Sequence, residues 1–522
     1  MHIIYIHSHD TGRYIEPYGH GVSTPNLMQL TREGTLFRQA YCAAPNCSPS
    51  RSALLTGMTP HANGMIGLAH RGFRLNDSSR HLSHYLSRHG YETALCGIQH
   101  EAEDDSELGY EHILHEKRQP GESLAQWDLA NARKAADFIR RYAERPHTET
   151  VSGPRPDDEI ETMSGIKSEL DPKHKLKHVN EPNTESNTES NTEPNTGPNT
   201  GPNTEPNTES NIEPNIEPNI EPNTEPGRSP LFLSFGMVST HREFPDQHDI
   251  NPDYVAPPYP LYDNAANRRD MAAFIASAAV MDECAGIVLS ALRETGLDED
   301  ALIVYTTDHG IAFPRMKCTL YDNGIGVALI VKMPGNQLAG KATDALVSQL
   351  DLFPTLCDAA ALPQPEWLEG TSLLPLFSGT TASIRDAVYA ELSFHAAREP
   401  LRGIRTERYK LIRRYETPGA VLPSNVDDGP AKRFLLDAGW LQYPADQATE
   451  QLFDLYLDPQ ENENVRSEAS YADIGADLSR KLDDWMRETA DPLLQEGGLQ
   501  APAGARVNVR TSLHPSDRDY EQ

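Results

Sequence analysis

The 522-residue sequence has no excess of positive charge, no Cys-x-x-Cys pair and, we expect, no apolar run of membrane-spanning length, and each absence excludes a class of protein. Its six cysteines form no Cys-x-x-Cys pair, which argues against a disulfide scaffold or a zinc knuckle. A formal net charge of −31 predicts no binding to nucleic acid or to anionic membranes. A strand-like run follows Met1 at once and leaves no room for a signal peptide, so we expect a cytoplasmic protein without a membrane span.

Alternating apolar runs and helical patterns predict an α/β fold with a mostly parallel sheet between helices. Strands are indicated at residues 2–6, 93–97, 230–236, 301–307 and 327–331. Helices are indicated at 25–33, 47–57, 81–89, 124–144 and 269–295. A smaller antiparallel sheet is predicted from runs at 387–392, 401–405, 409–413 and 451–456, with a helix at 474–488. We therefore expect a main domain over residues 1–380, a C-terminal subdomain over 381–497 and a tail over 498–522.

The composition changes abruptly from about Arg145 to Arg228. This segment is polar, and from Asn183 onward it repeats Asn-Thr-Glu-Pro with Ser, Gly and Ile substitutions. Frequent prolines remove backbone donors and few apolar side chains can be buried, so folding cannot offset the loss of chain entropy. We predict a disordered insert at 145–228, tolerated as a surface loop in preference to an adhesive or calcium-scavenging spacer.

The most specific motif lies between Asn46 and Gly57. Its proline and its final glycine predict a turn that leads into a helix, which places Cys47 at a helix N-terminus suited to anions. The pattern Cys-x-Pro-Ser-Arg-x-x-x-Leu-Thr-Gly resembles that of the type I sulfatases, in which the cysteine is converted to formylglycine. Every fixed position is matched here. Taken without the resemblance, Cys47 also fits an ordinary buried cysteine beside a helix start.

The resemblance implies an alkaline-phosphatase-like fold over nearly the whole chain apart from the insert. It also implies a formylglycine-generating enzyme as a partner that modifies Cys47. The run His61–Leu68 resembles the subgroup that contains the heparan N-sulfoglucosamine sulfohydrolases. This likeness implies a small sulfated substrate, a saccharide that carries a sulfate ester or an N-sulfate.

Two strand ends carry candidate metal ligands. Asp10 follows the first strand, where a carboxylate can hold a metal or serve as a turn residue. Sulfatases usually have an Asp pair here, whereas this chain has His9-Asp10. Asp308 and His309 follow the strand 301–307 and resemble the second half of the family's metal site. The resemblance implies one divalent cation held by Asp10, Asp308, His309 and residue 47, with calcium expected first and magnesium or manganese as alternatives.

The predicted catalytic residues include one departure from the family pattern. Sulfatases commonly show Gly-Lys-x-His after the strand at 93–97, and this sequence has Ile98 in place of the lysine while retaining His100. The resemblance implies that His100 assists the aldehyde hydrate and that Arg51 orients the formylglycine. From its position alone, His100 also fits a solvent-facing turn residue.

Two further residues are expected to bind the sulfate group. His241 follows the strand at 230–236, and Lys317 lies in a segment that follows the family's Lys-x-x-x-Tyr-x-x-Gly pattern. The resemblance implies that both contact sulfate oxygens, although a surface-loop histidine and a snorkelling lysine are the alternatives. In members of this family the C-terminal subdomain borders the substrate cleft, so the resemblance implies that His395 and Arg402 could touch a sugar.

The sequence therefore predicts a sulfatase that acts through a formylglycine made from Cys47. Two alternatives remain at this stage. One is a phosphonate monoester or phosphodiester hydrolase of the same superfold, which the Asp-His-Gly motif also suits. The other is a protein that binds sulfated glycans without catalysis because Cys47 is unmodified.

Overall fold

The computed structural model describes residues 1–145, 228–245, 249–416, 421–442 and 448–521. The predicted disordered insert at 145–228 lies outside these described residues, apart from its two end residues. The described elements include two separate sheets within one compact unit.

The larger sheet has eight strands in the order β4-β3-β5-β1-β6-β7-β2-β8. Their bounds are β1 His2–Ser8, β2 Thr35–Tyr41, β3 Glu92–Gly97, β4 His112–Ile113, β5 Leu231–Gly236, β6 Ala301–Thr307, β7 Leu329–Lys332 and β8 Lys341–Ser348. The central strand β1 pairs in parallel with β5 and β6, whereas β7 is antiparallel to both of its neighbours. The predicted α/β class with a mostly parallel sheet is confirmed.

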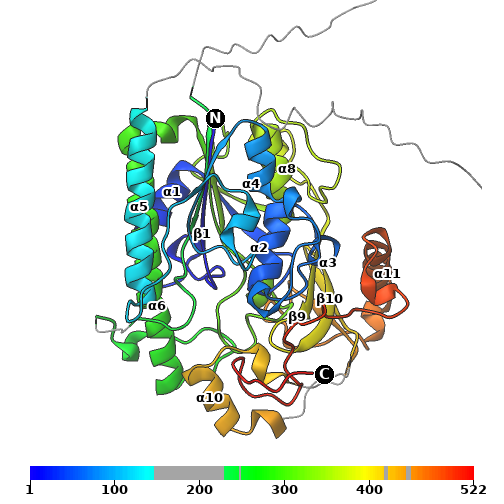
Figure 1. The fold of residues 1–522 in the computed structure, drawn as a ribbon. Coiled ribbons are helices and arrows are strands. Elements are labelled where there is room, and N and C mark those ends of the chain that lie inside the picture. The colour runs from blue at the N-terminus through cyan, green and yellow to red at the C-terminus, as the bar shows by residue number, and fades with distance from the viewer. Residues whose placement is uncertain (146–227, 246–248, 417–420, 443–447, 522) are drawn as a thin grey trace, which may run out of the picture. The chain divides into compact units, whose positions relative to one another are not determined.

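Helices cover both faces of this sheet (Figure 1). One layer contains α1 Pro25–Glu33, α5 Leu124–Glu144 and α6 Ala265–Thr295, and the other contains α2 Cys47–Thr56, α4 Leu82–Arg88 and α8 Leu352–Ala359. Side chains of β1 alternate between the two layers, because successive residues of a strand point to opposite faces. Ile4 and Ile6 join the core with α5 and α6, while Ile3 and Tyr5 join the core with α2, α4 and α8.

The helix α6 corrects one expectation. It is long and apolar enough to cross a membrane by length and composition, so the expectation that no stretch reaches this length was wrong. Of its most apolar window, 61% is buried inside the described fold, where α6 packs against α5 and the sheet. Core helices meet the same test, so α6 is weak evidence for a membrane span.

The smaller sheet lies in the C-terminal part of the chain and has the order β12-β11-β10-β9, all antiparallel. Its strands are β9 Ala387–Phe394, β10 Arg398–Thr406, β11 Tyr409–Arg414 and β12 Glu450–Asp454. The helix α11 Ala472–Glu488 packs Leu482 and Met486 against Ile404 and Leu411 of the sheet. The four predicted strands and the predicted helix are therefore confirmed.

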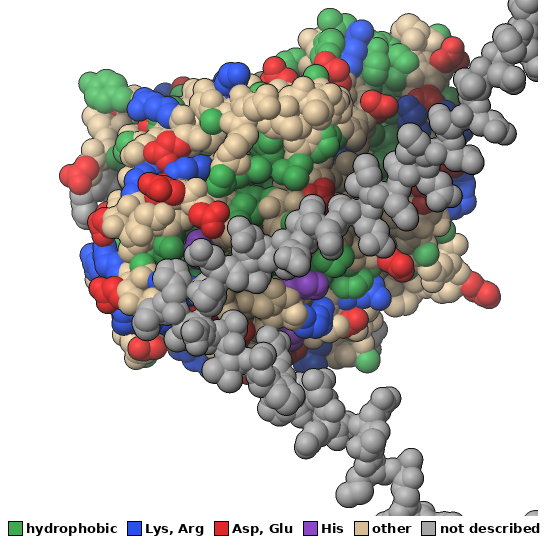
Figure 2. Space-filling view, turned by 90° about the horizontal axis from the view of Figure 1, so that it is seen from above, with side chains coloured by type: hydrophobic (Ala, Val, Ile, Leu, Met, Phe, Trp, Pro, Cys, Tyr) green, Lys and Arg blue, Asp and Glu red, His purple; other side chains and the backbone are tan. Residues whose placement is uncertain are grey.

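Short helices complete the described fold, namely α3 Pro60–Asn63, α7 Asp322–Ile325, α9 Leu374–Phe377 and α10 Pro430–Asp437. Figure 2 views the molecule from the end at which β1 begins, and acidic and basic side chains are interspersed on this face. The candidate site lies at the other end of the strands, where β1 and β6 finish.

Candidate active site

Cys47 begins α2 and is only 4% exposed. The chain reaches it through Asn46 in an extended conformation, and the helix ends at Gly57, which has a φ of 67° and donates its N–H to the Ala53 carbonyl. The positive φ at position 57 favours glycine, and a Cβ there would lie 2.4 Å from Leu368 Cδ2, so this leucine side chain would also have to move. The predicted turn and helix are confirmed.

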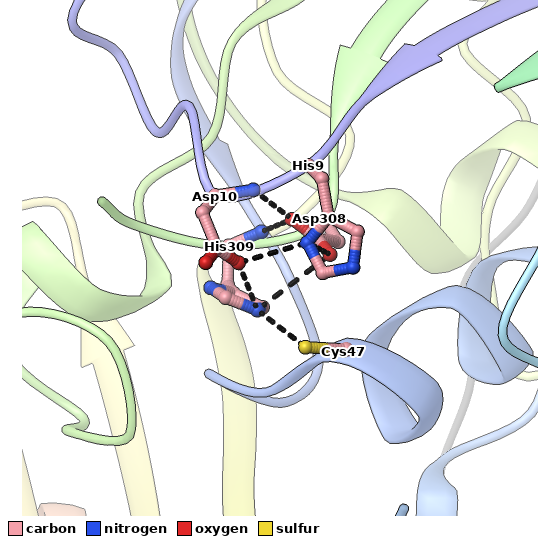
Figure 3. Close-up of side chains that lie close together, drawn as sticks. All are labelled: His9, Asp10, Cys47, Asp308 and His309. Atoms are coloured by element: carbon pink, nitrogen blue, oxygen red, sulfur yellow. Dashed lines mark hydrogen bonds and ion pairs between the residues drawn. The ribbon is translucent and has the colours of Figure 1, made fainter. Parts of the chain in front are cut away.

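Neighbouring strand ends bring the candidate metal ligands together. β1 and β6 are parallel and in register, with Ser8 opposite Thr307, so the residues that follow each strand meet at one edge of the sheet. Five residues form one group there, which we call the five-residue cluster: His9, Asp10, Cys47, Asp308 and His309. One ligand atom from each lies within 4.8 Å of every other. The side chains converge from three segments far apart in the sequence (Figure 3).

The contacts inside the five-residue cluster are those of a charged, closely packed site. His9 Nδ1 lies 2.9 Å from Asp10 Oδ1 and 3.1 Å from Asp308 Oδ2. His309 Nε2 lies 3.2 Å from Asp10 Oδ1 and 3.5 Å from Cys47 Sγ. Asp308 Oδ2 is buried and accepts no hydrogen bond from any described residue. A buried carboxylate oxygen whose contacts are ion pairs, here with His9 and Arg51, fits a bound divalent cation.

The positive charge of Arg51 compensates the negative charge of the carboxylates in the cluster. Arg51 Nη2 lies 3.2 Å from Asp308 Oδ2 and donates to the Ser8 carbonyl, and Nη1 contacts His7 Nδ1. Burial alone would raise the pKa of Asp308, but His309, His9 and Arg51 lower it below the usual range, so this carboxylate is ionised.

Cys47 itself is a poor thiolate nucleophile in this setting. Burial raises the pKa of the Cys47 thiol, and Asp10 and Asp308 raise it further, although Lys317 opposes them. A neutral buried thiol is unreactive, because the thiolate is the nucleophilic form. Among the protein groups alone, the Cys47 thiol is therefore neutral.

Lys317 lies between two acidic side chains. Its Nζ is 2.9 Å from Asp10 Oδ2 and 2.8 Å from Asp427 Oδ2. Burial alone would lower the pKa of Lys317, but Asp10 and Asp427 raise it well above its ordinary value, so the ammonium is charged. Sequence reasoning missed Asp427, which follows an irregular stretch near α10 and has no motif around it.

His100 and His241 line one side of the cluster. His100 Nδ1 is 3.0 Å from His9 Nε2, and the ring centroid of His241 is 4.6 Å from that of His9. His241 Nε2 is 3.9 Å from Asp10 Oδ2. Burial lowers the pKa of His100 well below its ordinary value, and His9 and Arg51 lower it further, so its ring is neutral. The structure thus gathers around the cluster all the residues predicted as metal ligands, catalytic residues or sulfate-binding residues.

The expectation that Arg402 could touch a sugar was wrong. Its side chain is 0% exposed, with Nε donating to Asp491 Oδ2 at 2.5 Å and Nη2 lying 3.2 Å from Glu391 Oε2. His61, Glu391 and Asp491 form a second group of potential metal ligands. In this group the positive charge that faces the two carboxylates is that of Arg402. His395 is 5% exposed, close to the 3% of Lys317, so its predicted contact with a sugar stays a prediction.

The comparisons with known proteins agree with this geometry. The sulfatase family matches residues 1–362, and the family described as N-sulphoglucosamine sulphohydrolase, C-terminal, matches residues 309–422. The chain is 27% identical to N-sulphoglucosamine sulphohydrolase of Homo sapiens over 502 residues, covering 90% of this chain and 86% of that protein.

Solved structures are similar over almost the whole chain. A protein in complex with its substrate D-glucosamine-2-N,6-O-disulfate gives a TM-score of 0.62 at 17% identity, covering 95% of this chain and 99% of the other. Phosphonate monoester hydrolase of Agrobacterium radiobacter gives 0.60 at 18% identity, covering 96% and 100%. Likenesses at these identities show the fold, and the predicted alkaline-phosphatase-like architecture is confirmed.

Proposed function

Because the chain belongs to the sulfatase family of sulfuric ester hydrolases, which use a divalent metal and a formylglycine, we propose that it hydrolyses a sulfate ester or N-sulfate of a sugar. The observation that carries the proposal is the position of Cys47, at a helix N-terminus and 3.5 Å from a histidine of a cluster with two carboxylates. A saccharide substrate is supported by the name of the human relative and by the sugar disulfate bound to a protein of the same fold.

The residues around Cys47 have the charges that this reaction needs. Sulfate esters resist hydrolysis because their negative oxygens repel nucleophiles, so the site must neutralise that charge. Formylglycine and a divalent ion, when present, supply a hydroxyl nucleophile beside positive charge. Arg51 forms an ion pair with Asp308 and orients the side chain of residue 47. Lys317 donates to the sulfate oxygens, its ammonium already drawn to the site by Asp10.

Two histidines complete the proposed machinery. His241 donates to a sulfate oxygen from the opening of the site, where its side chain is 30% exposed. We assign His100 to a hydrogen bond with the hydroxyl of residue 47, because burial lowers the pKa of its ring well below the ordinary value and so keeps it neutral. The lysine that relatives carry is replaced by Ile98, so Lys317 and Arg51 are the cations that we assign to the sulfate and to the nucleophile.

The remaining parts of the proposal concern partners, ion and location. A formylglycine-generating enzyme must act on Cys47 before folding is complete, because the folded chain buries this side chain. The family resemblance implies calcium as the divalent ion, with magnesium or manganese as alternatives. We retain the cytoplasm as the proposed location.

Peptide mass spectrometry tests the proposal most directly. Trypsin releases residues 39–51, which contain Cys42 and Cys47, so Cys42 serves as an internal control for alkylation. Conversion of Cys47 lowers the peptide mass by about 18 Da and leaves one alkylated cysteine in place of two. We expect this product together with turnover of an N-sulfated or O-sulfated glucosamine.

Two variants separate catalysis from folding. Cys47→Ala should abolish turnover, whereas Cys42→Ala removes a buried thiol nearby and should remain active. An aryl phosphonate assayed in parallel should be hydrolysed more slowly than an aryl sulfate. Turnover by Cys47→Ala, or an active preparation in which both cysteines are alkylated, would overturn the proposal.

A further inference from the structure

The carboxylates of the five-residue cluster offer few oxygen atoms to a metal. Asp10 Oδ2 is occupied by Lys317 Nζ at 2.9 Å. Asp308 Oδ1 accepts the backbone N–H groups of Asp10 at 2.8 Å and His309 at 3.0 Å. Asp10 Oδ1 and Asp308 Oδ2 therefore remain as the two carboxylate oxygens that face the cluster among the described residues, and Asp308 Oδ2 also lies 3.2 Å from Arg51 Nη2. Calcium takes six to eight oxygen ligands, so two carboxylate oxygens are a poor match for it.

Histidine nitrogens face the cluster beside these carboxylates, whereas a calcium site would present oxygen atoms. His309 Nδ1 lies 2.9 Å from the Gly310 carbonyl and donates to it, which leaves the lone pair of Nε2 directed at the cluster. His9 Nδ1 lies at hydrogen-bond distance from Asp10 Oδ1, 2.9 Å, and 3.1 Å from Asp308 Oδ2. A hydrogen bond from the remote nitrogen is the usual device that orients a histidine toward a metal.

His9 has such a partner as well. Its Nε2 lies 3.0 Å from His100 Nδ1. When His9 Nε2 carries the proton and donates to His100, the lone pair of His9 Nδ1 faces the carboxylate oxygens of Asp10 and Asp308. That arrangement is stable only with a cation between them, because a lone pair and two carboxylates otherwise repel one another. The chain's own residues thus present two imidazole nitrogens and two carboxylate oxygens, with residue 47 beside them.

We infer that this site selects a first-row transition dication, Mn²⁺ or Zn²⁺, over Ca²⁺, and that His9 is the residue that sets the preference. The inference rests on the proposed function only in assuming that the five-residue cluster is where the metal binds. Imidazole suits transition dications, whereas calcium prefers a shell of oxygen atoms alone. The expectation of calcium came from relatives with an Asp pair, and this chain has a nitrogen donor at the first position of that pair.

Competition binding tests the inference on the full-length protein. The protein is stripped with chelator, its Cys47 state is recorded by peptide mass, and it is dialysed against equal concentrations of Ca²⁺ with Mn²⁺ or with Zn²⁺. Bound metal is then counted by mass spectrometry of the elements. We expect about one transition ion per chain and an excess over calcium on the order of tenfold or more.

His9→Asp should restore a carboxylate and shift the ratio toward calcium on the order of tenfold. His20→Asp, which makes the same change at an exposed histidine, should leave the ratio unchanged. Spin-echo spectroscopy of the Mn²⁺-loaded protein should detect nitrogen-14 coupling from two imidazoles in the wild type and from one in His9→Asp. This readout distinguishes a ligand from a histidine that only donates a hydrogen bond to the carboxylates.

Three results would overturn the inference: calcium bound at least as strongly as either transition ion, a ratio unaffected by His9→Asp, or one imidazole coupling in the wild type. None of these depends on turnover. A preparation that binds Mn²⁺ or Zn²⁺ selectively but hydrolyses no sulfate would refute the proposed function alone. A calcium-selective enzyme with formylglycine at position 47 would refute the metal preference alone.

Discussion

Glu101 provides a test of the electrostatics beneath the site. It follows His100, is 2% exposed, and its Oε1 is buried without a hydrogen-bond partner in the part of the chain that the structure describes. Burial raises the pKa of Glu101 from an ordinary value of 4.5 to about 7, although Arg51 acts in the opposite direction. We predict that Glu101→Gln stabilises the protein at alkaline pH.

The sign and size of the effect follow from proton binding. Between pH 4.5 and 7 the folded chain holds a proton on Glu101 that the unfolded chain releases, so the free energy of unfolding falls as the pH rises through this window. The full difference in pKa corresponds to about 3 kcal/mol. Glutamine cannot ionise, so the variant lacks this loss. Relative to wild type, it should gain about 2 to 3 kcal/mol between pH 5 and pH 8.

Guanidinium unfolding at a series of pH values measures this gain. The difference between variant and wild type isolates position 101, because the other titrating groups are common to both proteins. Glu103→Gln, at a side chain that is 68% exposed, removes the same charge and should show no such trend. A difference that stays constant from pH 5 to pH 8, or that favours the wild type as pH rises, would refute the reasoning.

Three further predictions concern the cluster and its supports. Asp308→Ala should lower bound metal below a tenth of the wild-type content, and unchanged metal content by elemental analysis would contradict the ligand assignment. Gly97→Ala should lower the free energy of unfolding by about 3 kcal/mol or more in denaturant titrations, because φ is 86° and a Cβ would lie 1.9 Å from a backbone oxygen. The control Gly335→Ala has a φ of 74° but open space around it, so its free energy of unfolding should fall by only about 1 kcal/mol. Arg402→Met should cost about 3 to 5 kcal/mol because two buried carboxylates lose their cation, and a change below about 1 kcal/mol would show that they do not depend on it.

The central strands and the main site residues could be predicted because local sequence determines them. An apolar run that ends in a polar pair is visible without a structure, and β1 and β6 each have this form ahead of Asp10 and Asp308. The parallel register of the two strands then brings the pairs together. The motif around Cys47 similarly predicted both its helix and its place beside the cluster.

Elements at the sheet's edge could not be predicted in the same way. β8 is exposed along its first half and has no continuous apolar run, and β2 carries Arg38 and Gln39 in its middle. Such strands are defined by pairing with a neighbour rather than by their own pattern. Asp427 was missed for a related reason, since its contact with Lys317 joins segments more than a hundred residues apart and no periodicity marks it.

The orientation of His9 shows why a motif alone does not define a site. In a continuing strand, adjacent side chains point to opposite faces, so His9 and Asp10 could not both reach one metal. β1 ends at Ser8, however, and Asp10 has a φ of 53°, a conformation that costs a non-glycine residue about 1 kcal/mol or more. The Asp10 N–H gains the Asp308 carboxylate in return. The turn thereby directs both neighbouring side chains into the five-residue cluster, so the nitrogen of His9 and the carboxylate of Asp10 face the same group of ligand atoms.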